Sequence, residues 1–380
     1  MGRITIERNI KLDTITQRYH VTLDFGFDAK MNKRIRKSKV CKTLKEARSM
    51  LAKHETERAE GLTVLPTKLT LKAWLDNWLE NHVFFKEKTT AYAYRNIVNN
   101  HIIPFMGSKL LQTINAEQIQ AYYTHLATEK NLSPNTIRKH HDLFKQVFKI
   151  ALAQDKVKRN PMLSVTPPPE AKHILNFYTA EQLITLLNIC EGDRLEVYIK
   201  LCAFLGIRRG EACGLRWRDI DFGERVIFIC NTRTSAGSEK IEKSPKTTTS
   251  IRLLHMPDIL KKSLIKEKNR QEENKALLGE NYNKNDYVLV WPDGSKYRPN
   301  YLSELFSKFV ASRGLPSIVS HGLRHTFASI AHDSGLSDYD ISKALGHARV
   351  SVTQEIYLHA FQQSNMVVIQ AVENKLTPFL

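Results

Sequence analysis

Three consecutive prolines interrupt this chain shortly before its midpoint and set the strongest limit on its fold. The run Thr166-Pro167-Pro168-Pro169-Glu170 cannot continue a helix, so we expect an extended, semi-rigid spacer. A second break, residues 61–68, contains Gly61 and Pro66. Because each domain needs its own hydrophobic core, a chain of 380 residues with two such breaks is expected to form three domains.

The first segment, residues 1–63, is predicted to be a small α+β domain. Alternating apolar positions predict one strand over 19–25, and a second strand is expected over 33–40. Thr43 and the glutamate three residues later have the spacing of a capping box, which predicts a helix that runs toward Glu60.

A basic run dominates this first segment. Residues 30–42 contain seven basic residues and no acidic one. A sheet face that contacts DNA phosphates is favoured over a solvated charged hairpin, because the whole chain shares the basic bias. The residues predicted to make such contacts are Lys33, Arg34, Arg36, Lys37 and Lys39.

The second segment, residues 69–165, is predicted to be helical. Ser133 and Pro134 mark a helix start, as N-cap and first helical residue. Leucine and tryptophan recur at helical spacing in residues 71–79 and predict core positions. On the helix after Ser133, outward-facing DNA contacts are predicted for Arg138, Lys139 and His140.

Charge and composition narrow the class of protein. Lys and Arg number 57 against 39 Asp and Glu, and the net charge of +18 indicates a polyanionic partner. No apolar run approaches the roughly 18 residues of a membrane helix, and the N-terminus lacks the apolar core of a secretion signal. Five widely spaced cysteines fit reduced thiols in the cytoplasm better than disulfides or a zinc site.

The third segment, residues 174–380, contains four short patterns that together indicate a phosphoryl-transfer site. They are Gly206-Ile207-Arg208-Arg209-Gly210-Glu211, Pro245-Lys246-Thr247, His321-Gly322-Leu323-Arg324-His325, and Leu345-Gly346-His347, which is followed ten positions later by Tyr357. Each residue alone has an ordinary structural interpretation, as a surface cation, a helix end or a core tyrosine. Only their joint occurrence in this order is informative.

The residue types in these patterns fit attack on a phosphodiester. Two guanidiniums can hold the non-bridging oxygens, where negative charge develops, and they stay charged at any working pH. His321 and Arg324 are three residues apart, so on a helix they share one face. Tyr357 can act as the nucleophile, and a lysine can protonate the leaving 5′ oxygen.

In this order the patterns resemble those of the tyrosine recombinase family, in particular integrases of temperate phages and conjugative transposons. The resemblance implies catalytic roles for Arg208, Lys246, His321, Arg324, His347 and, as nucleophile, Tyr357. The catalytic lysine has two candidates. Where many relatives have two arginines, this chain has Ile251-Arg252, and Lys243 is a second candidate.

The resemblance also implies a multidomain fold. We expect an arm-type DNA-binding domain over 1–63 with a three-stranded sheet packed on a helix, and an all-helical, SAM-like core-binding domain over 69–165. Over 174–380 we expect a catalytic domain that is mostly helical with a small antiparallel sheet.

The implied function is integration and excision of a mobile element. The implied reaction passes through a 3′-phosphotyrosyl intermediate and a Holliday junction, and needs no cofactor or metal. The implied partners are double-stranded attachment-site DNA of core and arm type, further copies of the chain in a tetramer, an excisionase and a host DNA-bending protein. The expected location is the cytoplasm of a bacterial host, with no membrane partner.

Three other functions remain open on the sequence. A type IB topoisomerase would use similar chemistry, although the added basic N-terminal segment favours a recombinase. A metal-dependent nuclease needs clustered carboxylates, and the best local cluster is Asp219, Asp221 and Glu224. A non-catalytic DNA-binding protein would account for the charge alone.

Overall fold

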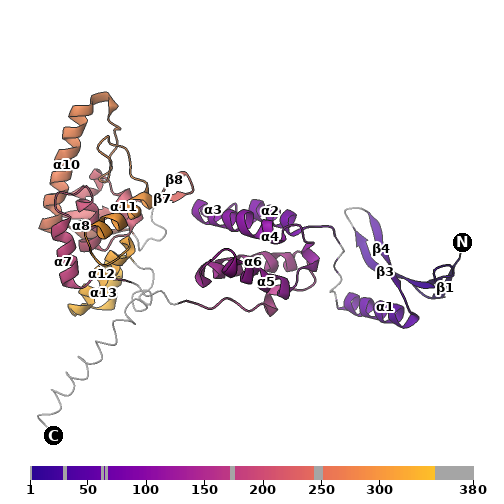
Figure 1. Cartoon of the computed structure of the whole chain (residues 1–380). Coiled ribbons are helices and arrows are strands. Elements are labelled where there is room, and N and C mark those ends of the chain that lie inside the picture. Colours follow the sequence, from indigo (N-terminus) through magenta and orange to yellow (C-terminus); the bar gives the residue numbers. More distant parts are fainter. Residues whose placement is uncertain are drawn as a thin grey trace, which may run out of the picture. The chain divides into compact units, whose positions relative to one another are not determined.

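The computed structural model describes residues 2–28, 32–60, 64, 67–171, 176–243 and 251–346 (Figure 1). The chain divides into two compact units, Met1–Lys172 and His173–Leu380, with the boundary just after the three prolines. The first unit contains two separate hydrophobic cores, one under the N-terminal sheet and one among helices. The second unit has a larger core of its own.

The N-terminal sheet has four antiparallel strands in sequence order and one helix. They are β1 (Arg3–Glu7), β2 (Ile10–Asp13), β3 (Arg18–Asp28), β4 (Lys33–Cys41) and α1 (Leu44–Ala59). Val21 and Leu23 of β3 pack with Ala47 of α1. The small α+β fold is as predicted, but the sheet has four strands where three were expected. Edge strand β1 has no fully buried residue, so no core pattern revealed it.

One helix in the helical part of the first unit, α6, begins where its local cap predicted it. Ser133 accepts a hydrogen bond from the Thr136 amide and Pro134 is the first residue of its helix, as expected. Trp74 and Trp78 are buried, which confirms their prediction as core residues. The elements are α2 (Leu71–Asn81), α3 (Lys88–Ile97), the π-helical turn η1 (Val98–Ile102), α4 (Ile103–Met106), η2 (Leu111–Thr113), α5 (Ala116–Thr128), α6 (Pro134–Ala153) and η3 (Pro161–Ser164).

The second unit is mostly helical, with two small antiparallel sheets, as expected. The three-stranded sheet has the order β5-β6-β9, and β7 pairs with β8 in a hairpin. The helices are α7 (Ala180–Ile189), α8 (Glu196–Leu205), α9 (Arg209–Gly214), η4 (Trp217–Asp219), α10 (Asp258–Leu278), η6 (Gly279–Asn281), α11 (Pro299–Ser312), α12 (Ser320–Asp333) and α13 (Asp338–Leu345). The strands are β5 (Ile220–Asp221), β6 (Val226–Ile229), β7 (Thr232–Ala236), β8 (Glu239–Lys243) and β9 (Arg252–His255).

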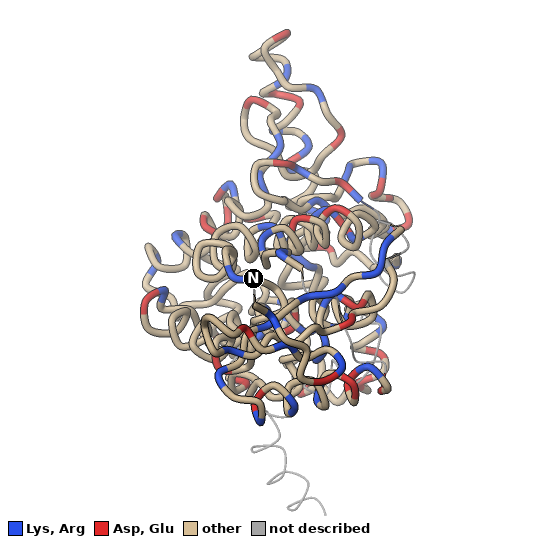
Figure 2. The backbone as a smooth tube through the Cα atoms, turned by 90° about the vertical axis from the view of Figure 1, so that its right-hand side faces the viewer, with Lys and Arg blue, Asp and Glu red and all other residues tan. Residues whose placement is uncertain are grey.

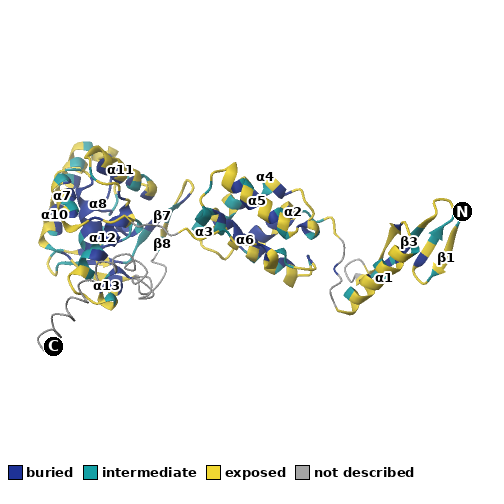
Figure 3. Ribbon diagram, turned by 60° about the horizontal axis from the view of Figure 1, so that its bottom comes forward, coloured by how far each residue is buried: buried dark blue, intermediate teal, exposed yellow. Residues whose placement is uncertain are grey.

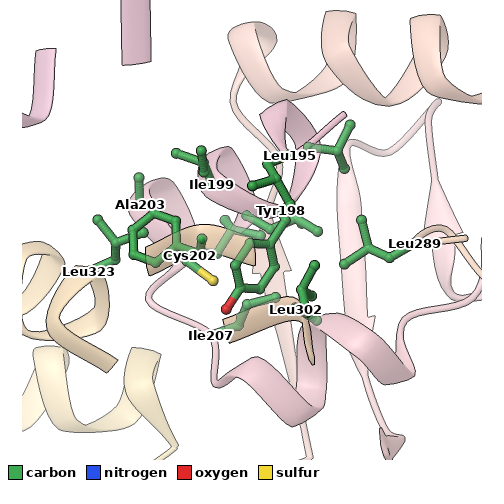
Figure 4. Packing of buried hydrophobic residues seen from close by; sticks show 14 of the residues in the cluster. Leu195, Tyr198, Ile199, Cys202, Ala203, Ile207, Leu289, Leu302 and Leu323 are labelled. Carbon is green, nitrogen blue, oxygen red and sulfur yellow. The ribbon is translucent and has the colours of Figure 1, made fainter. Parts of the chain in front are cut away.

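Helix α8 lies at the centre of the second unit. All of its residues except Phe204 are buried, and the ribbons labelled α8 and α12 are largely dark blue in Figure 3. Tyr198 and Cys202 of α8 pack with Leu302 of α11 and Leu323 of α12 (Figure 4). A helix buried on nearly every face must be enclosed by others, and its two charged residues, Glu196 and Lys200, pair with each other. Helix α8 therefore supports residues 206–208, which follow its C-terminal end, and helix α12, which packs against it.

Lys and Arg positions occur along the whole described backbone, interspersed with Asp and Glu (Figure 2). None of the helices in the described part of the chain is long and apolar enough to cross a bilayer. All five cysteines are free thiols, and only Cys230 is not buried.

Candidate active site

Arg208 lies in the tight turn between α8 and α9. Gly206 caps α8 in the left-handed conformation, with φ of 57°, which favours glycine. Its absent side chain also leaves room, because a Cβ there would lie 2.6 Å from Leu345 Cδ2 and 2.7 Å from Phe327 Cδ1. The chain then extends through Arg208, which occupies the N-cap position of α9.

Glu211 holds Arg208 by both its backbone and its side chain. The Arg208 amide donates to Glu211 Oε2 at 2.9 Å, and its Nη1 donates to Oε1 at 2.8 Å. The Glu211 side chain is only 3% exposed. Burial raises the pKa of Glu211, but Arg252 and then Arg208 lower it more, so its pKa lies below the usual value. Glu211 is therefore an ionised, buried carboxylate, which sequence reasoning had noted only as part of a motif.

Arg324 lies on the inner face of α12. Its Nη1 donates to the Gly206 carbonyl and its Nη2 to the Leu345 carbonyl, each at 2.7 Å. Burial, and next the charge of Arg208, lower the pKa of Arg324 to about 9. The guanidinium therefore remains charged at neutral pH. Arg324 joins the α8–α9 turn to the end of α13.

His321 and His325 stand one helical turn apart on α12. Their rings meet edge to face, with centroids 4.5 Å apart. Desolvation, and then the charges of Arg324 and Arg208, lower the pKa of His321, although part of its ring is exposed. His325 is buried, and burial lowers its pKa to about 4. Both imidazoles are therefore neutral at neutral pH, and a neutral imidazole can accept a proton.

Three arginines converge on the C-terminal end of α13. Arg252 Nε donates to the Ala344 carbonyl at 2.7 Å, Arg324 to that of Leu345, and Arg208 Nη2 to that of Gly346 at 3.2 Å. The last carbonyls of a helix lack intrahelical partners and carry partial negative charge, so they attract cations. The structure thus brings together two predicted arginines and Arg252, to which sequence reasoning had assigned no role. The position of Arg252 shortly after the Lys246 pattern is the sequence feature that could have indicated a role for it.

Three predicted site residues lie outside the described part of the chain: Lys246, His347 and Tyr357. The second lysine candidate, Lys243, is the last residue of β8 and pairs with Thr232 of β7. Gly346, the last described residue, immediately precedes His347. Of the predicted catalytic residues, the structure therefore describes Arg208, His321 and Arg324.

Two of the three acidic residues considered for a metal site, Asp219 and Asp221, have other partners. Asp219 accepts from Arg216 Nε at 2.8 Å, and Asp221 Oδ1 accepts from the amides of Gly223 and Glu224. Within the described residues, no group of three or more His, Cys, Asp or Glu is arranged to hold a metal ion. Asp219 therefore forms an ion pair with Arg216, and Asp221 stabilises a turn.

The residues of the first unit that were predicted to contact DNA differ in their exposure to solvent. The five basic residues of β4 are exposed, although Arg34 also pairs with Asp24 at 2.6 Å. On α6, Lys139 is exposed and Arg138 Nη1 donates to the Pro168 carbonyl at 2.8 Å. The prediction that His140 faces outward is wrong, since it is 1% exposed.

His140 is part of the helical core. Its Nδ1 lies 2.8 Å from the hydroxyl of Tyr122, also buried, and burial lowers its pKa to about 4. The residue lies three positions after Ile137 and four before Phe144, both of which are buried. Helical spacing therefore placed it inward, and its polar side chain had been given too much weight.

Comparison with known proteins identifies the class. The phage integrase family matches residues 175–364, and the SAM-like N-terminal domain of phage integrases matches residues 70–127. The chain therefore belongs to the phage integrase family, whose members break and rejoin DNA. Within that family it is a tyrosine recombinase of the integrase type.

Similar curated proteins span nearly the whole chain. A tyrosine recombinase XerC-like protein of Caldanaerobacter subterraneus subsp. tengcongensis is 28% identical over 92% of this chain and 94% of its own length. The ICEBs1 integrase of Bacillus subtilis is 25% identical over 94% of this chain and 97% of its own length.

Solved structures share the fold. The Tn1549 transposon integrase in complex with transposon right end DNA superposes with a TM-score of 0.68 at 20% identity, over 81% of this chain and all of that one. A lambda integrase tetramer bound to a Holliday junction gives 0.57 at 16% identity, over 93% of this chain and 96% of that one.

Proposed function

We propose that this recombinase cuts attachment-site DNA with Tyr357 while Arg208 and Arg324 hold the scissile phosphate. The observation that carries the proposal is the meeting of these arginines on adjacent carbonyls, those of Gly346 and Leu345. The arginines are 116 positions apart in sequence but share the end of α13 at Leu345, twelve residues before Tyr357 in the sequence.

The arginines supply electrostatic stabilisation. Negative charge develops on the non-bridging oxygens as the phosphorus is attacked, and preorganised guanidiniums stabilise that charge. The Arg208 side chain is 37% exposed and so is accessible to DNA. Arg324 is 2% exposed, and we expect the DNA-bound form to uncover its guanidinium.

The remaining groups move protons. The Tyr357 oxygen bonds to phosphorus while the bond from phosphorus to the 5′ oxygen breaks, which gives a 3′-phosphotyrosyl link. Neutral His321, with His347, accepts the phenol proton, and Lys246, or else Lys243, protonates the leaving 5′ oxygen. Attack by a 5′ hydroxyl from a second strand reverses these steps and passes through a Holliday junction. Because the phosphotyrosyl ester conserves the energy of the phosphodiester, the proposed reaction needs neither ATP nor a metal.

Other parts of the chain are proposed to hold DNA. Residues 1–63 would bind arm sites through β4, and residues 69–165 would bind core sites with residues 174–380. Exposed Lys33, Arg36 and Lys37, with the net charge of +18, support this division. We further propose a tetramer on DNA, as in the lambda integrase complex, assisted by an excisionase and a host DNA-bending protein in a bacterial cytoplasm.

The test is covalent capture. Candidate attachment-site DNA is incubated with the protein, and the adduct is measured under denaturing conditions. Tyr357→Phe should bind DNA but give no adduct, and Arg324→Lys should reduce its rate by roughly 100-fold or more, since a lysine cannot replace paired guanidinium donors. An adduct of normal yield from Tyr357→Phe would refute the proposed nucleophile.

A further inference from the structure

Arg252 is a buried arginine that faces the same carboxylate as Arg208. It lies on β9, opposite Ile229 of β6, and its side chain is 7% exposed. Its Nη2 donates to Glu211 Oε2 at 3.0 Å and its Nη1 to Oε1 at 3.4 Å. Both ends of the guanidinium fork therefore meet both oxygens of Glu211.

Glu211 stands between two arginines in consequence. Each of its oxygens accepts one hydrogen bond from Arg208 and one from Arg252. With Arg208 alone, the carboxylate would form a neutral pair and cancel the charge that a phosphate needs. With Arg252 as a second counter-ion, the charge of Arg208 stays in excess.

Arg252 also holds the segment on which the other arginines converge. Its Nε donates to the Ala344 carbonyl, next to the Leu345 carbonyl that binds Arg324. One side chain thus links β9, the start of α9 and the end of α13.

We propose that Arg252 is a positioning residue for DNA cleavage. It neutralises the Glu211 carboxylate, so that the positive charge of Arg208 is not cancelled and can act on the scissile phosphate. This inference rests on the proposed role of Arg208 in binding that phosphate. Arg252 acts through Glu211 and not by direct contact with DNA, because both ends of its guanidinium are paired with the Glu211 carboxylate, whereas Arg324 donates to backbone carbonyls. It also anchors the end of α13 through Ala344.

Loss of Arg252 would therefore act through an unbalanced buried carboxylate. In Arg252→Gln, ionised Glu211 keeps Arg208 as its remaining cation, so the phosphate meets a weaker positive charge. Burial then raises the pKa of Glu211 without the opposing charge of Arg252. Cleavage by this variant should recover as the pH falls and Glu211 becomes protonated.

The experiment compares four variants in the covalent adduct assay. They are Arg252→Gln, Glu211→Gln, the double variant Arg252→Gln/Glu211→Gln, and the matched control Arg270→Gln, which removes a similar two-contact arginine–glutamate pair on α10. Single-turnover rates are measured with saturating DNA, and DNA affinity is measured separately.

The expected result separates rate from affinity. Arg252→Gln should cut the rate by about 10- to 100-fold, as for residues that orient a reactive group, with unchanged affinity. The double variant should be faster than Arg252→Gln, because it removes the unbalanced charge, and its rate should lack the new pH dependence. Arg270→Gln should cleave like the unaltered chain.

Two results would overturn the inference. A double variant no faster than Arg252→Gln would show that Arg252 does not act through Glu211, and an equal loss of affinity would indicate direct DNA contact. If Arg252→Gln does not fold, Arg252→Lys is compared with Arg252→Met. The lysine keeps the positive charge, so the Arg252→Lys variant should retain more activity per folded molecule. Failure of the unaltered chain to form a Tyr357 adduct would instead refute the proposed function.

Discussion

At the scale of single residues, two buried polar side chains have partners far away in sequence. Arg324 reaches the Gly206 carbonyl 118 positions earlier, and His140 meets the hydroxyl of Tyr122 on a neighbouring helix. A buried polar group without a hydrogen bond costs stability, so these partners are part of the fold. They also make the charge states of the buried groups depend on folding.

His140 gives a pH prediction for the helical part of the first unit. Its pKa is about 4 when folded, against the ordinary value of 6.5 for a histidine, so between these values the unfolded chain binds the extra proton. Stability should fall as the pH drops through this window, by at most roughly 1.4 kcal/mol per pH unit, and this contribution should level off below pH 4. Hydrogen exchange of α5 and α6 at several pH values measures it.

The variant His140→Gln removes this titration. Its exchange free energy in α5 and α6 should depend less on pH than that of the unaltered chain, even if the variant is less stable throughout. His255→Gln, at an exposed position of β9, should leave the dependence unchanged. An identical slope in His140→Gln would show that other groups cause it.

At the scale of elements, the turn from α8 to α9 decides where both predicted arginines lie. Gly206 ends α8, offers its carbonyl to Arg324, and leaves room for Leu345 of α13. The turn, α12 and the end of α13 are therefore one packed arrangement.

Gly206→Ala tests this arrangement. A left-handed alanine alone costs about 1–2 kcal/mol, and here the added Cβ also meets Leu345 and Phe327. We expect a loss of stability larger than that strain, together with slower cleavage, because Arg208 and the end of α13 must shift. Denaturant unfolding and the adduct assay measure the two effects.

Gly335→Ala is the matched control. Gly335 also has a positive φ, of 84°, but nothing lies within 4 Å of a Cβ built there. It should show only the backbone strain and normal cleavage per folded molecule. Equal losses in the two variants would argue against a close fit around Gly206.

At the scale of the whole molecule, the chain combines units with separate cores and separate proposed DNA contacts. Residues 1–61 contain 15 basic and 8 acidic residues, a net charge of +7. Linked binding modules raise each other's effective concentration on one DNA molecule. The N-terminal part is therefore expected to govern integration more than cleavage.

Deletion of residues 1–63 tests this division. The shortened protein should still form the covalent adduct at core sites but should lose integration that requires arm DNA. Binding of arm DNA by the full chain should weaken steeply with added salt, because phosphate contacts release counterions. If the shortened protein integrates normally, β4 is only a charged surface.

What the sequence determined by itself was local. Ser133 with Pro134 and Thr43 with Glu46 start helices through contacts within a few residues, so the pattern suffices to place them. The order of the arginine, histidine and tyrosine motifs likewise identified the family. Burial was predictable where apolar residues recur at helical spacing, as at Trp74 and Trp78.

Only the tertiary structure decided which distant groups meet. That Glu211 joins Arg208 to Arg252, and that three arginines share the end of α13, depends on how α8, α12, α13 and β9 pack. No local pattern specifies such contacts, because a guanidinium can satisfy its donors with many partners. His140 shows the same limit, since the Tyr122 hydroxyl that makes its burial tolerable lies on another helix.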